Sequence, residues 1–257
     1  LNFSDYPNAV LAVFTQAPPD GALPKPGNQT WALETGEAPF HMPFIPPAIQ
    51  EHFKIFLTTK ADSHVPWING VFVANEEPEK LIPPEQQRRI LNEDNYRWLP
   101  KSHAGRRKKA FALISNLHAR NDRLQYIEEL AKYTDIDVFG RNHIPCPRSG
   151  AACLYELALQ YKFYLAFENS NCEDYITEKF FENALRQDMV PVVMGAPRES
   201  YCAIAPPNSF IHVDDFSSPA ELAGYLNWLD RNDTAYASYF AWRAYGNLAN
   251  TAVLSVV

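Results

Sequence analysis

The sequence has little glycine, 10 residues among 257, and contains none of the glycine-rich motifs that hold nucleotide phosphates. Neither G-x-G-x-x-G nor G-x-x-x-x-G-K-[ST] occurs, so dinucleotide-binding and P-loop assignments have no support. The G-x-S-x-G nucleophile elbow of α/β-hydrolases is absent as well. Any bound nucleotide must therefore be held by other groups.

Cysteine is also scarce. The spacings of the four cysteines, Cys146, Cys153, Cys172 and Cys202, match no zinc-binding pattern. The seven histidines are scattered along the chain, so a metal site built from cysteine and histidine is not expected. Four cysteines allow three disulfide pairings, and the sequence does not choose among them.

Long hydrophobic runs and an excess of positive charge are missing too. No apolar run is long enough to span a membrane, and no signal peptide is recognisable. The net charge of −7 argues against nucleic acid or an anionic membrane surface as a partner. A bound anion would need a local cluster of positive charge. The most basic run, residues 106–109, precedes a predicted strand and is interpreted as its solvated entry.

Residues 161–197 contain the highest concentration of side chains that could bind a ligand or take part in catalysis. Residues 163–167 and 190–194 are apolar runs of strand length. Between them, residues 175–186 have helical periodicity, with apolar side chains on one face and Tyr175, Glu178 and Lys179 on the other. This helix either binds a phosphate near its start, helped by Lys179, or presents a solvated face with local ion pairs.

Alternating strands and helices surround that segment. Strands are predicted over residues 110–115, 136–139 and 210–213, and helices over residues 122–133, 151–160 and 219–230. Ser218 is the predicted N-cap of the last helix. This alternation predicts a parallel, doubly wound sheet, that is, a Rossmann-like lobe.

The first hundred residues are less regular. Strands are predicted over residues 9–15, 31–33 and 53–59, helical character over 84–99, and a linker over 99–107. We therefore divide the chain into an N-terminal lobe, residues 1–103, and a C-terminal lobe, residues 104–257. Glu37 and His41 lie in a proline-flanked loop after the second strand, and such loops often carry catalytic groups.

Two further patterns have competing interpretations. Asp135 and Asp137 form a D-x-D pattern, which metal-dependent sugar-nucleotide transferases use to hold a divalent ion, but they also straddle a strand start, which favours a strand-edge acidic pair. Arg120 and Arg123 lie between a strand and the following helix. An arginine there either clamps a phosphate or pairs with a surface carboxylate.

Five runs resemble the signature of the alpha-1,3-fucosyltransferases, glycosyltransferase family 10: ISNLHARNDRLQYIEEL, YKFYLAFENSNCEDYITEKFFENAL, VPVVMGAPRESY, SFIHVDDFSSPAELAGYL and YFAWR. The match covers most of residues 108–243. Residues 114–130 and 165–181 are closest to the core alpha-1,3-fucosyltransferases of invertebrates and plants, which add fucose to the innermost GlcNAc of N-glycans. The N-terminal lobe matches more loosely, as expected of a lobe that reads variable acceptors.

The resemblance implies an α/β fold of GT-B type, with two Rossmann-like lobes facing a central cleft and GDP-fucose bound to the C-terminal lobe. It implies an inverting transferase that moves L-fucose from GDP-fucose to the 3-hydroxyl of a GlcNAc on an N-glycan, with the core GlcNAc as the expected acceptor. Two alternatives stay open. One keeps the donor but uses outer-chain N-acetyllactosamine (Lewis-type) or a distal GlcNAc, and the other is an inactive glycan-binding relative.

The family motif also implies individual donor contacts. Asn169, Tyr175, Glu178 and Lys179 match its donor-binding positions, with Lys179 facing the diphosphate and Tyr175 and Glu178 the ribose and neighbouring groups. Arg123 matches an arginine that also holds the diphosphate.

The family's W…ESP pattern matches Trp31 followed by Glu37-Ala38-Pro39, which makes Glu37 the expected catalytic base. Glu34, three residues earlier, is the alternative base. The resemblance requires no metal, because protein cations can stabilise the leaving GDP; Mn²⁺ or Mg²⁺ would act at most as an activator.

The family resemblance further implies a type II membrane protein of the Golgi lumen. The chain begins at Leu1 rather than at a methionine, so we expect an N-terminal membrane anchor outside this sequence. Sequons at Asn2, Asn28 and Asn232 agree with a glycoprotein of the secretory pathway.

Overall fold

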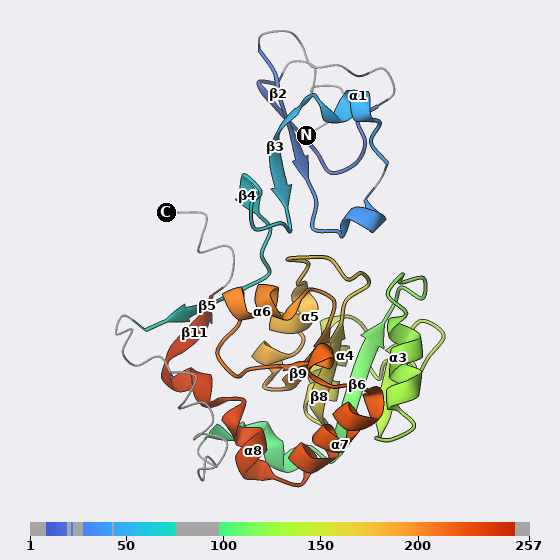
Figure 1. The fold of residues 1–257 in the computed structure, drawn as a ribbon, viewed down its shortest axis with the longest axis vertical. Coiled ribbons are helices and arrows are strands. Elements are labelled where there is room, and N and C mark those ends of the chain that lie inside the picture. The colour runs from blue at the N-terminus through green and yellow to red at the C-terminus, as the bar shows by residue number, and fades with distance from the viewer. Residues whose placement is uncertain (1–8, 20–21, 23–27, 43, 76–97, 250–257) are drawn as a thin grey trace.

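The computed structural model describes residues 9–19, 22, 28–42, 44–75 and 98–249. Within these ranges the chain forms a smaller lobe around a four-stranded sheet and a larger lobe around a five-stranded sheet (Figure 1). Among the described helices, none combines the length and the apolar character needed to cross a lipid bilayer.

Two sequence-based predictions fall outside these ranges. They are the sequon at Asn2 and the helix over residues 84–99, of which only the last two positions are described.

Five parallel strands build the sheet of the larger lobe, in the order β10-β9-β8-β6-β7. Their bounds are β6 Lys108–Ile114, β7 Ile136–Gly140, β8 Tyr161–Phe167, β9 Val190–Met194 and β10 Ile211–His212. Numbered along the chain, this is the 2-1-3-4-5 order of doubly wound proteins. The predicted parallel, Rossmann-like sheet is therefore confirmed.

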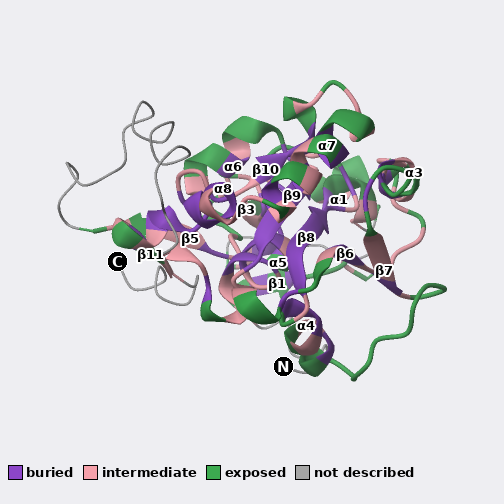
Figure 2. Cartoon of the chain, turned by 90° about the horizontal axis from the view of Figure 1, so that it is seen from below, coloured by how far each residue is buried: buried purple, intermediate pink, exposed green. Residues whose placement is uncertain are grey.

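Helices cover both faces of this sheet. Their bounds are α3 Arg123–Leu130, α4 Ala151–Ala158, α5 Glu178–Phe181, α6 Arg198–Ile204, α7 Pro219–Asp230 and α8 Asp233–Ser238. Side chains alternate along β8, so that Phe163 and Leu165 pack with α3, α7 and α8, whereas Tyr164 and Ala166 pack with α4, α5 and α6. Because both faces are covered, β8 is buried along its whole length (Figure 2).

The start of α7 follows the sequence-based prediction. The Ser218 hydroxyl accepts a hydrogen bond from the backbone N–H of Glu221 at 3.3 Å, and the helix runs to Asp230. A serine in this position satisfies one of the N–H groups that the first helical turn leaves unpaired.

The helix predicted over residues 175–186 is wrong at both ends. Its regular part, α5, has only four residues and begins at Glu178, after Thr177, whose hydroxyl oxygen accepts a hydrogen bond from the backbone N–H of Lys179. Tyr175 therefore precedes the helix instead of lying on its outer face, and it is buried.

Beyond α5, backbone hydrogen bonding becomes irregular. The N–H of Asn183 bonds to the carbonyl of Glu178 at 2.9 Å, and a short 3-10 turn follows at Leu185–Gln187. Phe180, Phe181 and Leu185 still fill the core, as their spacing predicts. Apolar spacing thus predicted which side chains are buried but not where the regular helix ends.

The smaller lobe has a parallel sheet in the order β1-β2-β3-β4. Its elements are β1 Leu11–Phe14, β2 Thr30–Glu34, β3 Phe53–Thr58, β4 Val65–Pro66 and the short helix α1 Pro47–Gln50. The core is aromatic, because the ring of Trp31 lies 4.7 Å from that of Phe14 and 5.7 Å from that of Phe53. The three strands predicted here are confirmed.

The last described strand pairs with a strand that follows the smaller lobe's sheet in the chain. Strand β5, Val71–Ala74, pairs antiparallel with β11, Gly246–Ala249 (Figure 1). Within the run interpreted as a linker, a 3-10 turn at Lys101–Gly105 packs on the larger lobe, where His103 bonds to Asp233 at 2.9 Å. The division of the chain at residues 103 and 104 stays a prediction.

The interpretation of residues 106–109 as a solvated entry is wrong for Arg106. Its side chain is buried, and its guanidinium donates hydrogen bonds to the carbonyls of Ala158 at 2.9 Å, of Gln187 at 2.8 Å, and of Asp188. These carbonyls belong to the last turns before β8 and β9. The planar guanidinium spreads its donors over three nitrogens and so reaches carbonyls of two separate segments, whereas a lysine donates from a single nitrogen.

We expect Arg106→Met to lower the free energy of unfolding by roughly 3 kcal/mol, because three carbonyls would lose their donor in a buried place. Arg107→Met is the matched control, since Arg107 is exposed. It should change stability by less than about 0.5 kcal/mol. Urea denaturation of both variants checks this, and equal stability of the two would contradict the structural role of Arg106.

Candidate active site

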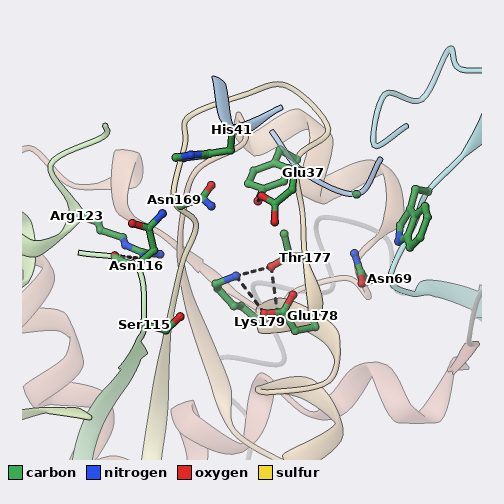
Figure 3. Close-up of a pocket in the computed structure, with 13 residues that line it drawn as sticks. Glu37, His41, Asn69, Ser115, Asn116, Arg123, Asn169, Thr177, Glu178 and Lys179 are labelled. Atoms are coloured by element: carbon green, nitrogen blue, oxygen red, sulfur yellow. Dashed lines mark hydrogen bonds and ion pairs between the residues drawn. The ribbon is translucent and has the colours of Figure 1, made fainter. Parts of the chain in front are cut away.

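A cavity of about 600 Å³ lies between the two lobes (Figure 3). The smaller lobe lines it with Gly36, Glu37, His41, Trp67 and Asn69, and the larger lobe with Ser115, Asn116, Arg123, Asn169, Tyr175, Thr177, Glu178 and Lys179. All six residues predicted as catalytic or donor-binding therefore line one cavity. Glu34, the alternative base, is not among the lining residues.

The topology of the larger sheet explains this position. Strands β6 and β8 are neighbours, and the chain order reverses between them, so their following loops diverge and leave a crevice. Ser115 and Asn116 follow β6, and Asn169 follows β8, so all three reach the cavity from the carboxyl edge of the sheet. Ser115 and Asn116 were not singled out from the sequence.

Lys179 is the positive charge at the floor of the cavity. Its Nζ lies 3.1 Å from Glu178 Oε1 and 2.8 Å from Thr177 Oγ1 (Figure 3). It also lies 3.1 Å from Glu168 Oε2. Burial alone would lower the pKa of this ammonium, but the charges of Glu168 and Glu178 outweigh it and raise the pKa above its ordinary value. Lys179 is therefore protonated throughout the physiological range.

Glu168 lies beneath Lys179 and is fully buried. Its Oε1 accepts hydrogen bonds from the backbone N–H and the hydroxyl of Thr177, at 2.8 and 2.9 Å. Burial raises the pKa of this carboxyl, whereas Lys179 and the Thr177 bonds act in the opposite direction. Sequence reasoning assigned no role to Glu168 or Thr177. The available signal was a carboxylate directly after the all-apolar strand 163–167.

Arg123 is placed in the cavity wall, but its bonds go to the backbone. Its guanidinium donates to the carbonyl of Phe167 at 2.8 Å and to that of Asn116 at 2.9 Å, thereby joining the ends of β8 and β6. Its Nε has no hydrogen-bond partner within the described part of the chain. Burial lowers the pKa of this guanidinium, with Glu168 opposing the shift.

Glu37 reaches the cavity from the loop after β2 and is exposed there. The Tyr175 hydroxyl, from the larger lobe, donates a long hydrogen bond to Glu37 Oε2 at 3.4 Å. Burial raises the pKa of Tyr175, and the charges of Glu168 and Glu37 add to this. Tyr175 is therefore a neutral donor that bridges the two lobes.

His41 lies above the cavity, near Glu37 and Asn169 (Figure 3). Its Nε2 is buried and makes no hydrogen bond to any described residue. The sequence placed His41 in the same loop as Glu37 without assigning it a function. The unpaired nitrogen marks it as a group that a ligand in the cavity could engage.

The segment after β8 also carries the contacts that dock the smaller lobe. Lys60 pairs with Glu173 at 2.6 Å, and the backbone N–H of Ala61 donates to Asp174 Oδ2 at 3.0 Å. The Asn69 side chain donates to the carbonyl of Ile176 at 3.1 Å. The residues just before α5 therefore border the cavity and hold the opposite lobe at the same time.

The D-x-D aspartates lie at the other end of the sheet. Asp137 pairs with Lys108 at 3.0 Å, and Asp135 pairs with Lys109 at 3.5 Å, so both act as a strand-edge acidic pair. In the part of the chain that the structure describes, no group of three or more His, Cys, Asp and Glu side chains is arranged to hold a metal ion.

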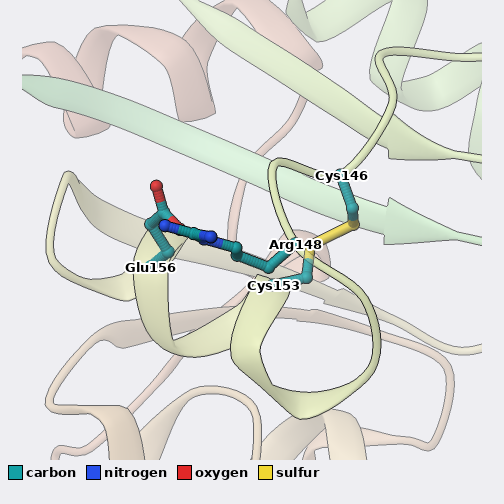
Figure 4. The surroundings of a disulfide bond; sticks show 4 residues. All are labelled: Cys146, Arg148, Cys153 and Glu156. Carbon is teal, nitrogen blue, oxygen red and sulfur yellow. A yellow bond between two sulfur atoms is a disulfide. The ribbon is translucent and has the colours of Figure 1, made fainter.

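One disulfide is formed, between Cys146 and Cys153 (Figure 4). It ties the loop after β7 to the first turn of α4, and an ion pair between Arg148 and Glu156 at 3.1 Å joins the same two segments. Cys172 and Cys202 are free thiols.

Substitutions of Thr177 test whether the hydrogen bonds at the floor of the cavity stabilise the fold. Thr177→Val has nearly the same shape but no hydroxyl, so Glu168 and Lys179 each lose a buried partner. We expect the free energy of unfolding to fall by about 2 kcal/mol. Thr177→Ser keeps the hydroxyl and should lose less than about 0.5 kcal/mol. Thermal or urea unfolding measures both, and a Val variant as stable as the Ser variant would contradict the described network.

Residues 103–255 match the sequence profile of glycosyltransferase family 10 (fucosyltransferase) C-term. The glycoprotein 3-alpha-L-fucosyltransferase A of Drosophila melanogaster is 55% identical over 146 residues, which are 56% of this chain and 29% of the relative. The alpha-(1,3)-fucosyltransferase 4 of Bos taurus is 37% identical over 224 residues, which are 86% of this chain and 52% of the relative. The chain thus spans about half of the length of the bovine relative and 29% of the length of the Drosophila relative.

Solved structures agree with these matches. An alpha1,3-fucosyltransferase crystallised with GDP-fucose superposes with a TM-score of 0.58 at 18% identity, covering 90% of this chain and 69% of that chain. A second structure of an alpha1,3-fucosyltransferase, with GDP, gives a TM-score of 0.58 at 20% identity and covers 90% and 68%. The likeness confirms the predicted GT-B fold. Because the family profile covers more than half of its length, the chain belongs to glycosyltransferase family 10, the fucosyltransferases.

Proposed function

We propose that this chain provides the active site of an alpha-1,3-fucosyltransferase, which moves L-fucose from GDP-fucose to the 3-hydroxyl of a GlcNAc on an N-glycan with inversion. One observation carries the proposal. An exposed carboxylate from the smaller lobe, Glu37, and a charged ammonium from the larger lobe, Lys179, line the same cavity. The reaction needs these two groups on opposite sides of the sugar.

The larger lobe holds the donor. Lys179 binds the diphosphate, which takes the place of Glu178 on the ammonium; Glu178 is 54% exposed and free to turn toward the ribose. Arg123 adds positive charge at the ends of β6 and β8, and Asn169 and Tyr175 contact the rest of the donor. Because α5 is a single turn, its dipole contributes little, and the side-chain cations carry the electrostatic part.

The chemistry is one in-line displacement. The acceptor 3-hydroxyl oxygen forms a bond to fucose C1 while the bond from C1 to the β-phosphate oxygen breaks, and its electron pair leaves with GDP. Glu37 takes the hydroxyl proton as that oxygen attacks. Lys179 and Arg123 stabilise the charge that grows on GDP. Attack from the face opposite the leaving group inverts C1.

No obligatory metal enters this scheme, because fixed protein cations face the leaving group; Mn²⁺ or Mg²⁺ would act at most as an activator. We place the enzyme in the Golgi lumen as a type II membrane protein. The disulfide between Cys146 and Cys153 supports an oxidising compartment.

For the acceptor we propose the core GlcNAc of N-glycans. The support is the 55% identity to a relative named glycoprotein 3-alpha-L-fucosyltransferase A. An outer-chain N-acetyllactosamine acceptor is the second candidate, because a human relative named 4-galactosyl-N-acetylglucosaminide 3-alpha-L-fucosyltransferase FUT6 is 48% identical over 130 residues.

A GDP-release assay with a panel of acceptors tests the function directly. We expect turnover with an N-glycan whose core GlcNAc is free at the 3-hydroxyl, and none once that hydroxyl is blocked. Turnover only with N-acetyllactosamine would shift the acceptor to the outer chain. Glycan binding without GDP release on any acceptor would reject the transferase and leave a glycan-binding protein.

Substitutions of Glu37 and of Lys179 should change different constants, the first kcat and the second the Kd of GDP-fucose. Glu37→Gln should reduce kcat by about 10²- to 10⁴-fold and leave the Kd of GDP-fucose within twofold, since the base acts only in the transition state. Lys179→Ala should raise that Kd by about a hundredfold or more, because a buried charge contact is lost. Glu34→Gln is the matched control for Glu37. If Glu37→Gln kept full activity and Glu34→Gln lost activity, Glu34 would be the catalytic base instead of Glu37.

A further inference from the structure

Glu168 is the one fully buried carboxylate at the cavity among the described residues, and the proposed chemistry does not use it. We propose that Glu168 is a positioning residue of the donor site, which holds Lys179 and Thr177 where the nucleotide diphosphate meets them. This inference rests on the proposed function, because it assigns the diphosphate to Lys179.

Three groups depend on this carboxylate. Its Oε1 accepts from the N–H and the hydroxyl of Thr177, at 2.8 and 2.9 Å, and its Oε2 accepts from the same hydroxyl at 2.9 Å and pairs with Lys179 Nζ at 3.1 Å. Thr177 in turn accepts a hydrogen bond from Lys179 Nζ at 2.8 Å. The three side chains form a closed set in which the ammonium cannot move without breaking bonds to both partners.

The backbone opposite Glu168 is shaped to admit it. Gly195 follows β9 with a φ of 152°, and a Cβ built there would lie 2.8 Å from Glu168 Cβ and 2.9 Å from its Cγ. A side chain at 195 would displace the stem of Glu168. The Cβ and Cγ of Glu168 therefore pack against Gly195, while its carboxylate bonds to Thr177 and Lys179.

Two carboxylates contact Lys179, but they differ in freedom. Glu178 is 54% exposed and makes a peripheral contact, so an incoming anion can replace it. Glu168 is 0% exposed and bonded through both oxygens. When the diphosphate binds, Glu178 thus leaves the ammonium. Glu168 stays bonded to it and keeps it charged and in position.

The pH at which Lys179 loses its charge distinguishes this role from packing, because a residue that only packs would not change it. The titratable groups that face it are Glu168 and Tyr164 from β8 and its end, Glu178 from α5, and Tyr175 from the preceding loop. Removing the negative charge of Glu168 leaves Glu178 as the one carboxylate that opposes burial, so the Lys179 pKa falls relative to that of the native protein. The variant would then lose the ammonium charge at a lower pH than the native protein does.

The test variant is Glu168→Gln, which keeps the volume and an oxygen for Thr177 but places an amide against Lys179. We expect the KM for GDP-fucose and the Kd for GDP to rise about tenfold at pH 7. The acceptor KM should stay within twofold. The ratio of variant to native Kd for GDP should increase further from pH 7 to pH 10, and ionisation of the nucleotide itself cancels in that ratio.

Matched controls separate this role from general loss of structure. Glu182→Gln removes a carboxylate from the same segment, where Glu182 pairs with Arg186 at 2.7 Å on the surface, and should leave both constants unchanged. Gly195→Ala keeps the charge of Glu168 but crowds its Cβ and Cγ and strains the backbone at a φ of 152°, and it should raise the Kd for GDP as well. Its control is Gly224→Ala, since nothing lies within 4 Å of a Cβ at that position.

The outcomes are distinguishable. If the native protein does not bind GDP, the proposed function fails and the positioning role fails with it. If the native protein binds GDP but Glu168→Gln stays within twofold with a flat pH ratio, only the positioning role is overturned. If Glu168→Gln does not fold, Gly195→Ala decides, and an unchanged Kd in a folded Gly195→Ala would overturn the role.

Discussion

The buried ion pair between Glu168 and Lys179 is the interaction on which the site depends. A lysine this deep would be driven toward its neutral form by desolvation, and a carboxylate with no exposed surface would be driven toward protonation. In the pair, with Thr177 bonded to both, the charge of Glu168 raises the pKa of Lys179, and Lys179 opposes the rise in the Glu168 pKa that burial causes. The result is a fixed positive charge at the carboxyl edge of a parallel sheet, where a nucleotide diphosphate can meet it.

The segment between β8 and α5 links that charge to the opposite lobe. Glu173, Asp174 and Ile176 bond to the smaller lobe, and Tyr175 reaches Glu37. The proposed donor site and the contacts that dock the smaller lobe therefore share one short stretch of chain. This arrangement explains how the proposed base from one lobe and the proposed donor site from the other come to line a single cavity, which is the geometry that an in-line displacement requires.

Much of the larger lobe was predictable, because apolar runs of strand length alternate with helices and parallel strands bring their loops to one edge. The six site residues were placed by resemblance, and no spacing rule would have joined Glu37 to Lys179. The sequence-based predictions were wrong where tertiary side-chain contacts outweigh local conformational preference. Arg106 looked solvated but caps buried carbonyls, and residues 175–186 looked like one helix although Thr177 and Glu168 delay its start. Glu168 itself carried no periodic signal.

A crystal structure of the complex with GDP tests the central claim most directly. The account predicts that a diphosphate oxygen lies within hydrogen-bond distance of Lys179 Nζ, that Glu178 has left the ammonium, and that Glu168 remains bonded to Lys179 and Thr177. It also predicts that Glu37 faces the diphosphate across the cavity. A nucleotide bound elsewhere, or a Glu168 carboxylate that has separated from Lys179 in the complex, would contradict it.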